Sequence, residues 1–135
     1  MSYEELSHTA DVKIRARAPT CDALFGEAFL ALMHVMYGDD RKGGTSRIID
    51  ISAPDRESLL LDFLSEVLFV SEVDGLVFCR ADVHLDGMQI HAVLDGEPFD
   101  PARHAKGTEV KGIPYSGMSM GKDAKGYMLD ILFDV

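Results

Sequence analysis

Apolar residues recur at helical spacing in two segments of the chain. In the first, about Cys21 to Tyr37, two apolar stripes lie side by side, which predicts a helix buried over most of its surface. Thr20 is placed to cap the start of this helix. Gly38 follows its last residue, where glycine commonly ends a helix.

The second helical segment spans about Arg56 to Val73 and has a narrower apolar stripe. Asp55 precedes it as a capping residue and Gly75 closes it. Its acidic residues Asp62 and Glu66 are one turn apart and share its polar side. The pattern therefore predicts a helix with one face packed inward and an acidic outer face.

Strands are predicted where apolar and polar residues alternate. The pattern is clearest from Val12 to Ala18, and Asp11 stands at the start of that strand. Further strands are predicted at about Tyr3 to Leu6, Arg47 to Ser52 and Tyr127 to Asp134. The order of the elements predicts an α+β fold, in which two helices pack on a mainly antiparallel or mixed β-sheet. Because no repeat or long linker interrupts it, residues 1–135 are expected to form a single domain.

A hairpin is predicted around Asp86-Gly87, a dipeptide that favours a tight two-residue turn because glycine tolerates positive φ. The turn joins alternating segments at Leu76 to Leu85 and Met88 to Leu94. In the register that this turn sets, Met88 belongs to the apolar face, with Cys79, Ala81, Val83, Ile90 and Ala92.

The polar face of the same hairpin contains candidate chemistry. The predicted register puts Asp82 opposite His91, with His84 nearby, a group that could ligate a metal ion or transfer protons. Solvent-facing polar pairs are commoner on such a face, so a functional site is the weaker interpretation. His34 lies on a predicted helix and His104 in a loop, and neither has a second histidine at ligand spacing.

Composition narrows the functions open to this chain. Its formal net charge of −10 repels phosphate backbones, so direct nucleic-acid binding is disfavoured, and a cation or a basic protein fits better. The acidic start of the chain differs from the basic and apolar run of a secretory signal, and we expect a cytoplasmic protein with no membrane segment. Cys21 and Cys79 are far apart within apolar patterns, as is typical of reduced core thiols.

Oxygen ligands for a metal ion stand at both ends of the chain. His8-Thr9-Ala10-Asp11 lies near the start, and Asp134 and the terminal carboxylate of Val135 lie at the finish. Carboxylates held close together repel one another unless a calcium, magnesium or manganese ion neutralises them. A solvated aspartate at the chain end is the alternative. No nucleophile elbow or phosphate-binding glycine loop is present, so we expect no catalytic residue, although residues far apart in the sequence can still meet in space.

These residues resemble the motifs of the archease family. His8-Thr9-Ala10-Asp11 matches its N-terminal motif, Leu59 to Leu68 its second-helix signature, and Asp74 to Phe78 the segment that follows. The likeness continues through Asp100 to His104, Glu109-Val110-Lys111 and Tyr115 to the terminal aspartate. Each motif is short, but together their order and spacing cover the chain nearly end to end.

The resemblance implies a non-catalytic activator of an RtcB-type RNA ligase, the enzyme that joins RNA ends in tRNA splicing and RNA repair. Archeases promote guanylylation of that ligase and its repeated turnover, and the resemblance implies only indirect contact with RNA. The family's divalent ion, calcium with magnesium or manganese as alternatives, maps onto Asp11, Asp134 and Val135. The residues expected to contact the partner are His8, Asp62, Glu66, Lys111 and Tyr115.

Some features leave alternatives open. Pro114-Tyr115-Ser116 departs from the family pattern, in which a histidine follows the tyrosine, and this loss could alter the partner surface. Asp130 shares a predicted strand face with Asp134 and could supplement the metal site or only face solvent. A general chaperone or scaffold is one alternative function. A small metal-dependent phosphohydrolase is another, although no general base is evident.

Overall fold

Strands and helices follow one another in the order that the pattern predicts. The computed structural model describes residues 1–6 and 11–135. Its elements are β1 (Ser2–Leu6), β2 (Val12–Ala18), α1 (Cys21–Tyr37), β3 (Thr45–Ser52), α2 (Arg56–Asp74), β4 (Leu76–Asp86), β5 (Gln89–Pro98), α3 (Pro101–His104), the 3-10 helix η1 (Tyr115–Gly117), β6 (Ser119–Asp123) and β7 (Gly126–Phe133).

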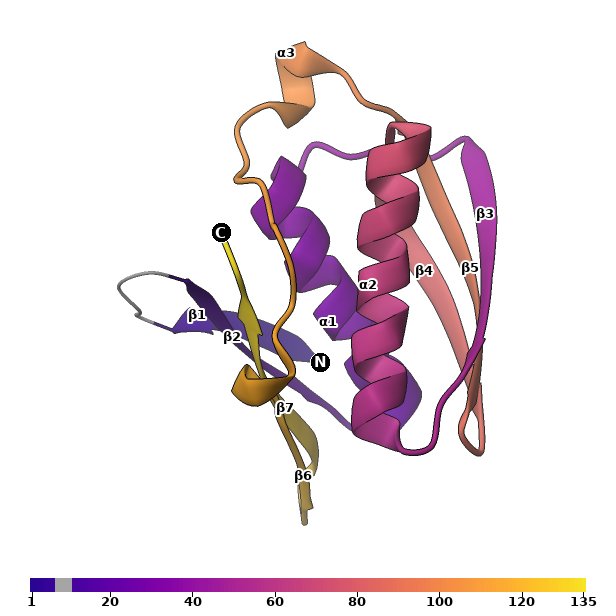
Figure 1. Ribbon diagram of the computed structural model, residues 1–135, viewed down its shortest axis with the longest axis vertical. Helices are drawn as coiled ribbons and strands as arrows, with labels where there is room; N and C mark the ends of the chain where they lie inside the picture. The colour runs from indigo at the N-terminus through magenta and orange to yellow at the C-terminus, as the bar shows by residue number, and fades with distance from the viewer. Residues whose placement is uncertain (7–10) are drawn as a thin grey trace.

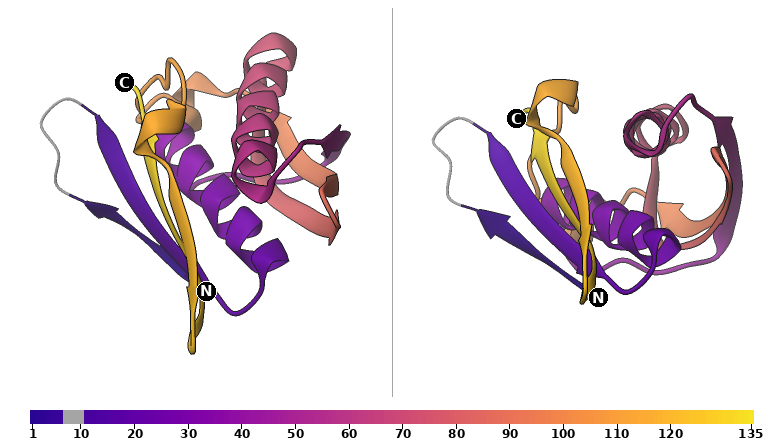
Figure 2. Two further views of the ribbon diagram at one scale, coloured as in Figure 1. Left: turned by 60° about the horizontal axis from the view of Figure 1, so that its bottom comes forward. Right: turned by 90° about the horizontal axis from the view of Figure 1, so that it is seen from below.

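Helix α1 lies between two antiparallel sheets (Figures 1 and 2). The strand order is β1-β2-β7-β6 in the first sheet and β3-β5-β4 in the second. Helix α1 contacts β1, β2 and β7 of the first sheet and β4 of the second, whereas α2 packs on the three strands of the second sheet. The predicted α+β fold is confirmed, and the structure adds that its antiparallel strands divide into two sheets.

The predicted helix ends are confirmed by their capping contacts. The Thr20 hydroxyl accepts a hydrogen bond from the Ala23 N–H at 3.2 Å, and α1 ends before Gly38. The Asp55 carboxylate accepts one from the Ser58 N–H at 2.7 Å, which starts α2. Because α1 faces a sheet on each side, its apolar residues are buried almost all round, as its two stripes predict.

The hairpin between β4 and β5 forms with a turn one residue later than predicted. Asp86 pairs with Gln89, so the two turn residues are Gly87 and Met88. Gly87 has a φ of 60° and Met88 does not have a positive φ, which together give the type II′ geometry that favours glycine at the first turn position.

The shift of the turn corrects two predictions. Asp82 does not lie opposite His91: it pairs with Val93, and His84 is the residue opposite His91. Met88 is a turn residue with 43% of its surface exposed, so it does not belong to the apolar face. When the turn moves by one residue, the residue opposite any given position changes by two. The same residues therefore stay on each face of the hairpin, but every cross-strand partner changes.

The core joins both helices to both sheets. Phe25 of α1 and Phe63 of α2 are fully buried, and their rings stack with centroids 6.2 Å apart. Cys21 is buried, Cys79 is half-buried and both are free thiols, as predicted. In the part of the chain that the structure describes, no helix is long and apolar enough to cross a membrane.

Candidate functional site

One end of the β1-β2-β7-β6 sheet brings together residues from both ends of the chain. Strands β2 and β7 pair antiparallel, and their last pair at this end is Val12 with Phe133. One step further along the same register come Asp11 and Asp134. Directly opposed residues on neighbouring antiparallel strands have Cβ atoms about 4.5–5.5 Å apart, so the register points to two adjacent carboxylates.

Asp134 is also tied to a third segment of the chain. The Lys111 N–H donates to the Asp134 carbonyl at 2.7 Å, and the Asp134 N–H donates to the Gly112 carbonyl at 2.9 Å. This two-bond bridge fixes the backbone on both sides. The side chains of Lys111 and Asp134 are both exposed, so the end of the sheet carries a lysine and an aspartate whose backbones are joined.

A network of charges anchors the segment that carries Lys111. The Glu97 carboxylate accepts hydrogen bonds from both terminal nitrogens of the Arg103 guanidinium, one of them at 2.9 Å, and from the Lys42 N–H at 2.7 Å. These bonds, led by those from Arg103, lower the pKa of Glu97 from 4.5 to about 2. They hold α3 against the end of β5 and the loop after α1.

Buried His104 completes this anchor. Its Nδ1 accepts a hydrogen bond from the Asp100 N–H at 2.9 Å, so in the neutral ring the proton lies on Nε2. Nε2 is 3.3 Å from Glu97 Oε2 but is not aligned for a hydrogen bond. Beyond α3, the Thr108 N–H donates to the Val35 carbonyl at 2.8 Å, and the chain then passes between α2 and β7 (Figure 1).

Asp130 is engaged in an ion pair with Arg15. It lies opposite Arg15 on β2, whose guanidinium donates to both of its carboxylate oxygens at 2.8 and 3.1 Å. The hydrogen bonds from Arg15 lower the pKa of Asp130. The structure thus gives Asp130 a partner within the sheet and favours a structural role over that of a further metal ligand.

The chemistry of the chain-end site is that of oxygen donors. Asp11, Asp134 and the terminal carboxylate of Val135 are hard ligands, which suit calcium or magnesium. Within residues 1–6 and 11–135, no three His, Cys, Asp or Glu side chains cluster as a metal site. A site with the donors expected from the sequence would combine the two aspartates with the carboxylate of Val135, and such a donor set would fit a hard cation that also takes ligands from water or a partner.

The other predicted partner residues lie on different elements. His8 falls outside the described residues. Asp62 is exposed and Glu66 half-buried on α2. Tyr115 of η1 is 51% exposed and lines a hollow with residues of the start of α2 and the β6–β7 hairpin. The structure brings Lys111 to Asp134 but gives Tyr115 a separate setting.

His91 of the hairpin has a different partner from the predicted Asp82. His91 Nδ1 is 2.5 Å from Asp50 Oδ1 on β3, and both side chains are at least half exposed. This arrangement is the solvent-facing polar pair that sequence reasoning preferred. The Glu97–Arg103 network, in contrast, does not follow from the sequence, because Arg103 matches the family only as part of the Asp100 to His104 segment and Glu97 lies beyond the predicted end of its strand at Leu94.

Comparison with known proteins decides the family. Residues 3–135 match the model of the Archease protein family. This chain belongs to the archease family. It is 36% identical to the protein archease of Methanosarcina mazei, over 98% of this chain and 95% of the relative. It is 32% identical to the protein archease-like of Drosophila melanogaster, over 100% and 91% of the two chains.

Solved structures share the archease fold. The solution structure of Methanobacterium thermoautotrophicum protein 1598 aligns with a TM-score of 0.80 at 22% identity and covers 98% of each chain. The crystal structure of an archease from Thermotoga maritima, described there as a possible chaperone, gives a TM-score of 0.69 at 16% identity and covers 98% of this chain and 96% of that one.

Proposed function

We propose that this archease is a non-catalytic, divalent-metal-binding activator of a cytoplasmic RtcB-type RNA ligase, which promotes guanylylation and repeated turnover of the ligase in tRNA splicing or RNA repair. The observation that carries the proposal is the convergence of Asp11, Asp134 and Lys111 at one end of a sheet, in a chain of the archease family. Contact with RNA is indirect in this account, because the chain has a net charge of −10.

The proposed ion site uses Asp11 and Asp134 from neighbouring strands and the carboxylate of Val135. When bound, calcium supplies positive charge that offsets these carboxylates and an open coordination position for a partner's ligand. Magnesium or manganese would serve by the same chemistry. Lys111 is held to Asp134 through its backbone, which leaves its ammonium group available to an anionic group such as a nucleotide phosphate.

The docking surface is proposed to be acidic and to meet a basic region of the ligase. Asp62 and Glu66 on α2 are its candidate anions, with His8 and Tyr115 as further contacts. Opposite charges speed encounter and orient the partners. Ser116, which stands where the family pattern has histidine, is exposed and follows Tyr115 in η1. If the missing histidine weakens the contact with the ligase, Ser116→His should strengthen stimulation of the ligase.

The docking proposal is tested by guanylylation rates measured against salt concentration. Asp62→Lys and Glu66→Lys should slow guanylylation severalfold at low salt, and the effect should shrink as salt screens the charges. Glu72→Lys changes the same charge on an exposed residue of the same helix and serves as the matched control. If the two variants stay folded and stimulate the ligase as fully as the control does, the proposed surface is wrong.

The metal proposal is tested by calcium titration calorimetry. Asp11→Ala or Asp134→Ala should abolish stoichiometric binding, because each removes a charged oxygen ligand. Asp130→Ala should leave binding nearly unchanged, since the Asp130 carboxylate is paired with Arg15. Residues added after Val135 should weaken binding. Unchanged affinity in both the Asp11 and Asp134 variants would move the site elsewhere.

A chaperone is the second candidate function, favoured by the description of the Thermotoga maritima relative as a possible chaperone. A chaperone should suppress aggregation of unrelated clients, whereas an activator should affect its ligase alone. A metal-dependent phosphohydrolase would instead turn over phosphoesters without a partner, and Asp11→Ala would abolish that turnover.

A further inference from the structure

Strand β4 forms an open edge of its sheet, and α1 runs beside it. Within residues 1–6 and 11–135, the strand order β3-β5-β4 leaves one side of β4 without a partner strand. At the start of α1, the Asp22 carboxylate accepts a hydrogen bond from the Leu85 N–H at 3.2 Å. Just beyond the end of α1, Arg41 Nε donates to the Phe78 carbonyl at 3.0 Å. Side chains from the two ends of the helix therefore cap the two ends of this edge.

Between the two caps, residues 79–84 of β4 line a hollow that they share with α1. The bond from Leu85 to Asp22 shows that the Leu85 N–H points away from β5. Backbone groups in a strand alternate in direction, so those of Ala81 and Val83 point the same way, whereas those of Asp82 and His84 point toward β5. Between the two caps, the amides of Ala81 and Val83 therefore face outward, where another strand could pair with them.

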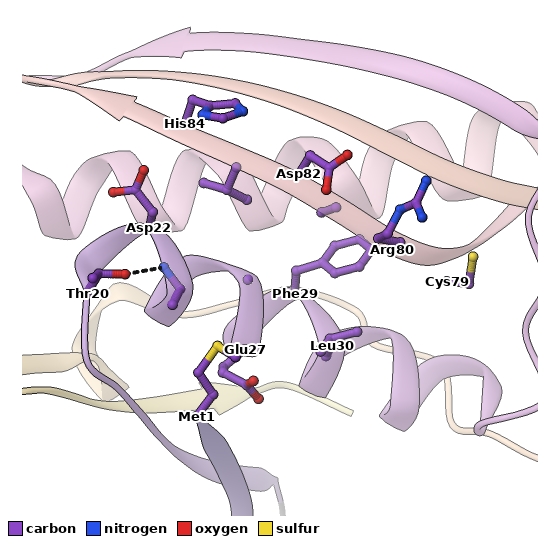
Figure 3. Close-up of a pocket in the computed structure, with 14 residues that line it drawn as sticks. Met1, Thr20, Asp22, Glu27, Phe29, Leu30, Cys79, Arg80, Asp82 and His84 are labelled. Atoms are coloured by element: carbon purple, nitrogen blue, oxygen red, sulfur yellow. Dashed lines mark hydrogen bonds between the residues drawn. The ribbon is translucent and has the colours of Figure 1, made fainter.

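A cavity of about 790 Å³ lies between this edge and α1. Its lining on α1 includes Ala23, Gly26 and Leu30. Figure 3 shows Leu30 on α1 together with Arg80 and Asp82 of β4. Gly26 is internal to a helix, where glycine destabilises by roughly 1 kcal/mol relative to alanine. No crowding requires it, because a Cβ added at Gly26 would meet no heavy atom within 4 Å. At Gly26 the wall of the cavity is therefore bare backbone, with open space beside it.

The charges around the cavity favour a basic occupant. Asp22, Glu27 and Asp82 line it, and burial raises the pKa of Glu27, although the positive charge of the Met1 amino group acts in the opposite direction. The lining cations are Arg80, which is 3.5 Å from Asp95 outside the cavity, and the amino group of Met1; His84 adds a titratable group. The cavity lining thus has three carboxylates but only two cations, Arg80 and the Met1 amino group, and Arg80 also pairs with Asp95. The excess of negative charge favours an occupant with positive charge.

We propose that this cavity binds an extended segment of a partner protein, which adds as a strand to the β4 edge and alternates apolar with basic side chains. The apolar side chains would pack toward Gly26 and Leu30, and the basic ones would lie beside Asp82 on the exposed face of the sheet. Main-chain hydrogen bonds to Ala81 and Val83 would fix the register. The proposal goes beyond ligase activation and uses none of the residues of the chain-end site.

A second copy of the chain fits this edge less well than a peptide. In each copy, α1 runs along its own β4 between the Asp22 and Arg41 caps. Pairing two β4 edges would therefore bring the two α1 helices against each other. An extended segment carries no such helix and can enter the cavity.

The test is binding of a capped, fluorescein-labelled peptide of alternating lysine and valine, measured by anisotropy. We expect it to bind at least about tenfold more tightly than a glutamate–valine peptide of the same length. Val83→Pro removes an outward N–H without removing a bond to β5, and Gly26→Leu fills the cavity. Each should weaken binding about tenfold or more, whereas Gly121→Leu, at a glycine with open space on β6, should not.

Hydrogen exchange separates strand addition from loose charge attraction. In the free protein the amides of Ala81 and Val83 should exchange quickly, while those of Asp82 and His84 are protected by β5. Saturating peptide should protect Ala81 and Val83. Fast exchange in the complex, equal binding of both peptides, or protection that rises with protein concentration without peptide would each overturn the proposal, the last in favour of a second copy. Asp11→Ala should bind the peptide normally, so failure of the ligase proposal would leave this result unaffected.

Discussion

The carboxylate of Glu97 is the point at which the stability of this fold should depend most clearly on acid. Its pKa is lowered from 4.5 to about 2 by hydrogen bonds from Arg103 and from the Lys42 backbone. Since the folded state keeps Glu97 ionised at lower pH than the unfolded chain does, the interaction stabilises the fold fully above pH 4.5. That stabilisation is lost as the pH falls from there toward 2.

The size of this effect follows from the pKa and from the position of the network. The full difference in pKa corresponds to roughly 3 kcal/mol. The paired side chains of Glu97 and Arg103 are 14% and 26% exposed, so water screens part of it. We therefore expect Glu97→Gln to lower the free energy of unfolding by about 1–2 kcal/mol at neutral pH and to lower the Tm by roughly 4–8 °C.

The assay is urea unfolding of both proteins over a series of pH values. The unmodified protein should lose its advantage over Glu97→Gln as the pH falls below 4.5, and the two stabilities should converge near pH 2. Glu109→Gln, on an exposed carboxylate of the following segment, should follow the unmodified protein throughout. Parallel stability curves for the unmodified protein and Glu97→Gln would refute this account of the network.

Two further substitutions test how the fold positions the site. Asp55→Ala should cost α2 its capping bond and lower the free energy of unfolding by about 1 kcal/mol in urea titrations; an unchanged midpoint would contradict the cap. Gly107→Ala should destabilise by about 2 kcal/mol or more, because the added Cβ would lie 2.0 Å from the Met36 carbonyl oxygen. Gly121→Ala is the control, because Gly121 has open space around it. Equal thermal midpoints for the two alanine variants would contradict the close approach of Gly107 to Met36.

Local signals in the sequence predicted the helices well. Thr20 and Asp55 cap their helices through contacts three residues away, and Gly38 and Gly75 end them, so the information lies within one turn of each boundary. The sequence predicts the hairpin turn one residue too early. Asp86-Gly87 is typical of a type I′ turn, whereas the chain forms a type II′ turn with Gly87 in the first turn position.

The non-local features could not be predicted from the pattern. Alternation identifies a strand but does not choose its neighbour, so the division into two sheets and the bridge from Asp134 to Lys111 and Gly112 follow only from the structure. Asp11 and Asp134 were paired from their positions near the chain ends and from the family resemblance. The β2–β7 register supports that pairing, but their role as metal ligands remains a prediction.

Repeated turnover of an RtcB-type ligase tests the central claim most directly. With RNA in excess and ligase limiting, the amount of joined product per ligase should rise well above one when this protein is added. Asp134→Ala, folded as judged by its thermal melt, should leave turnover close to the level of the ligase alone. Turnover that is unchanged by the unmodified protein would contradict the proposed function.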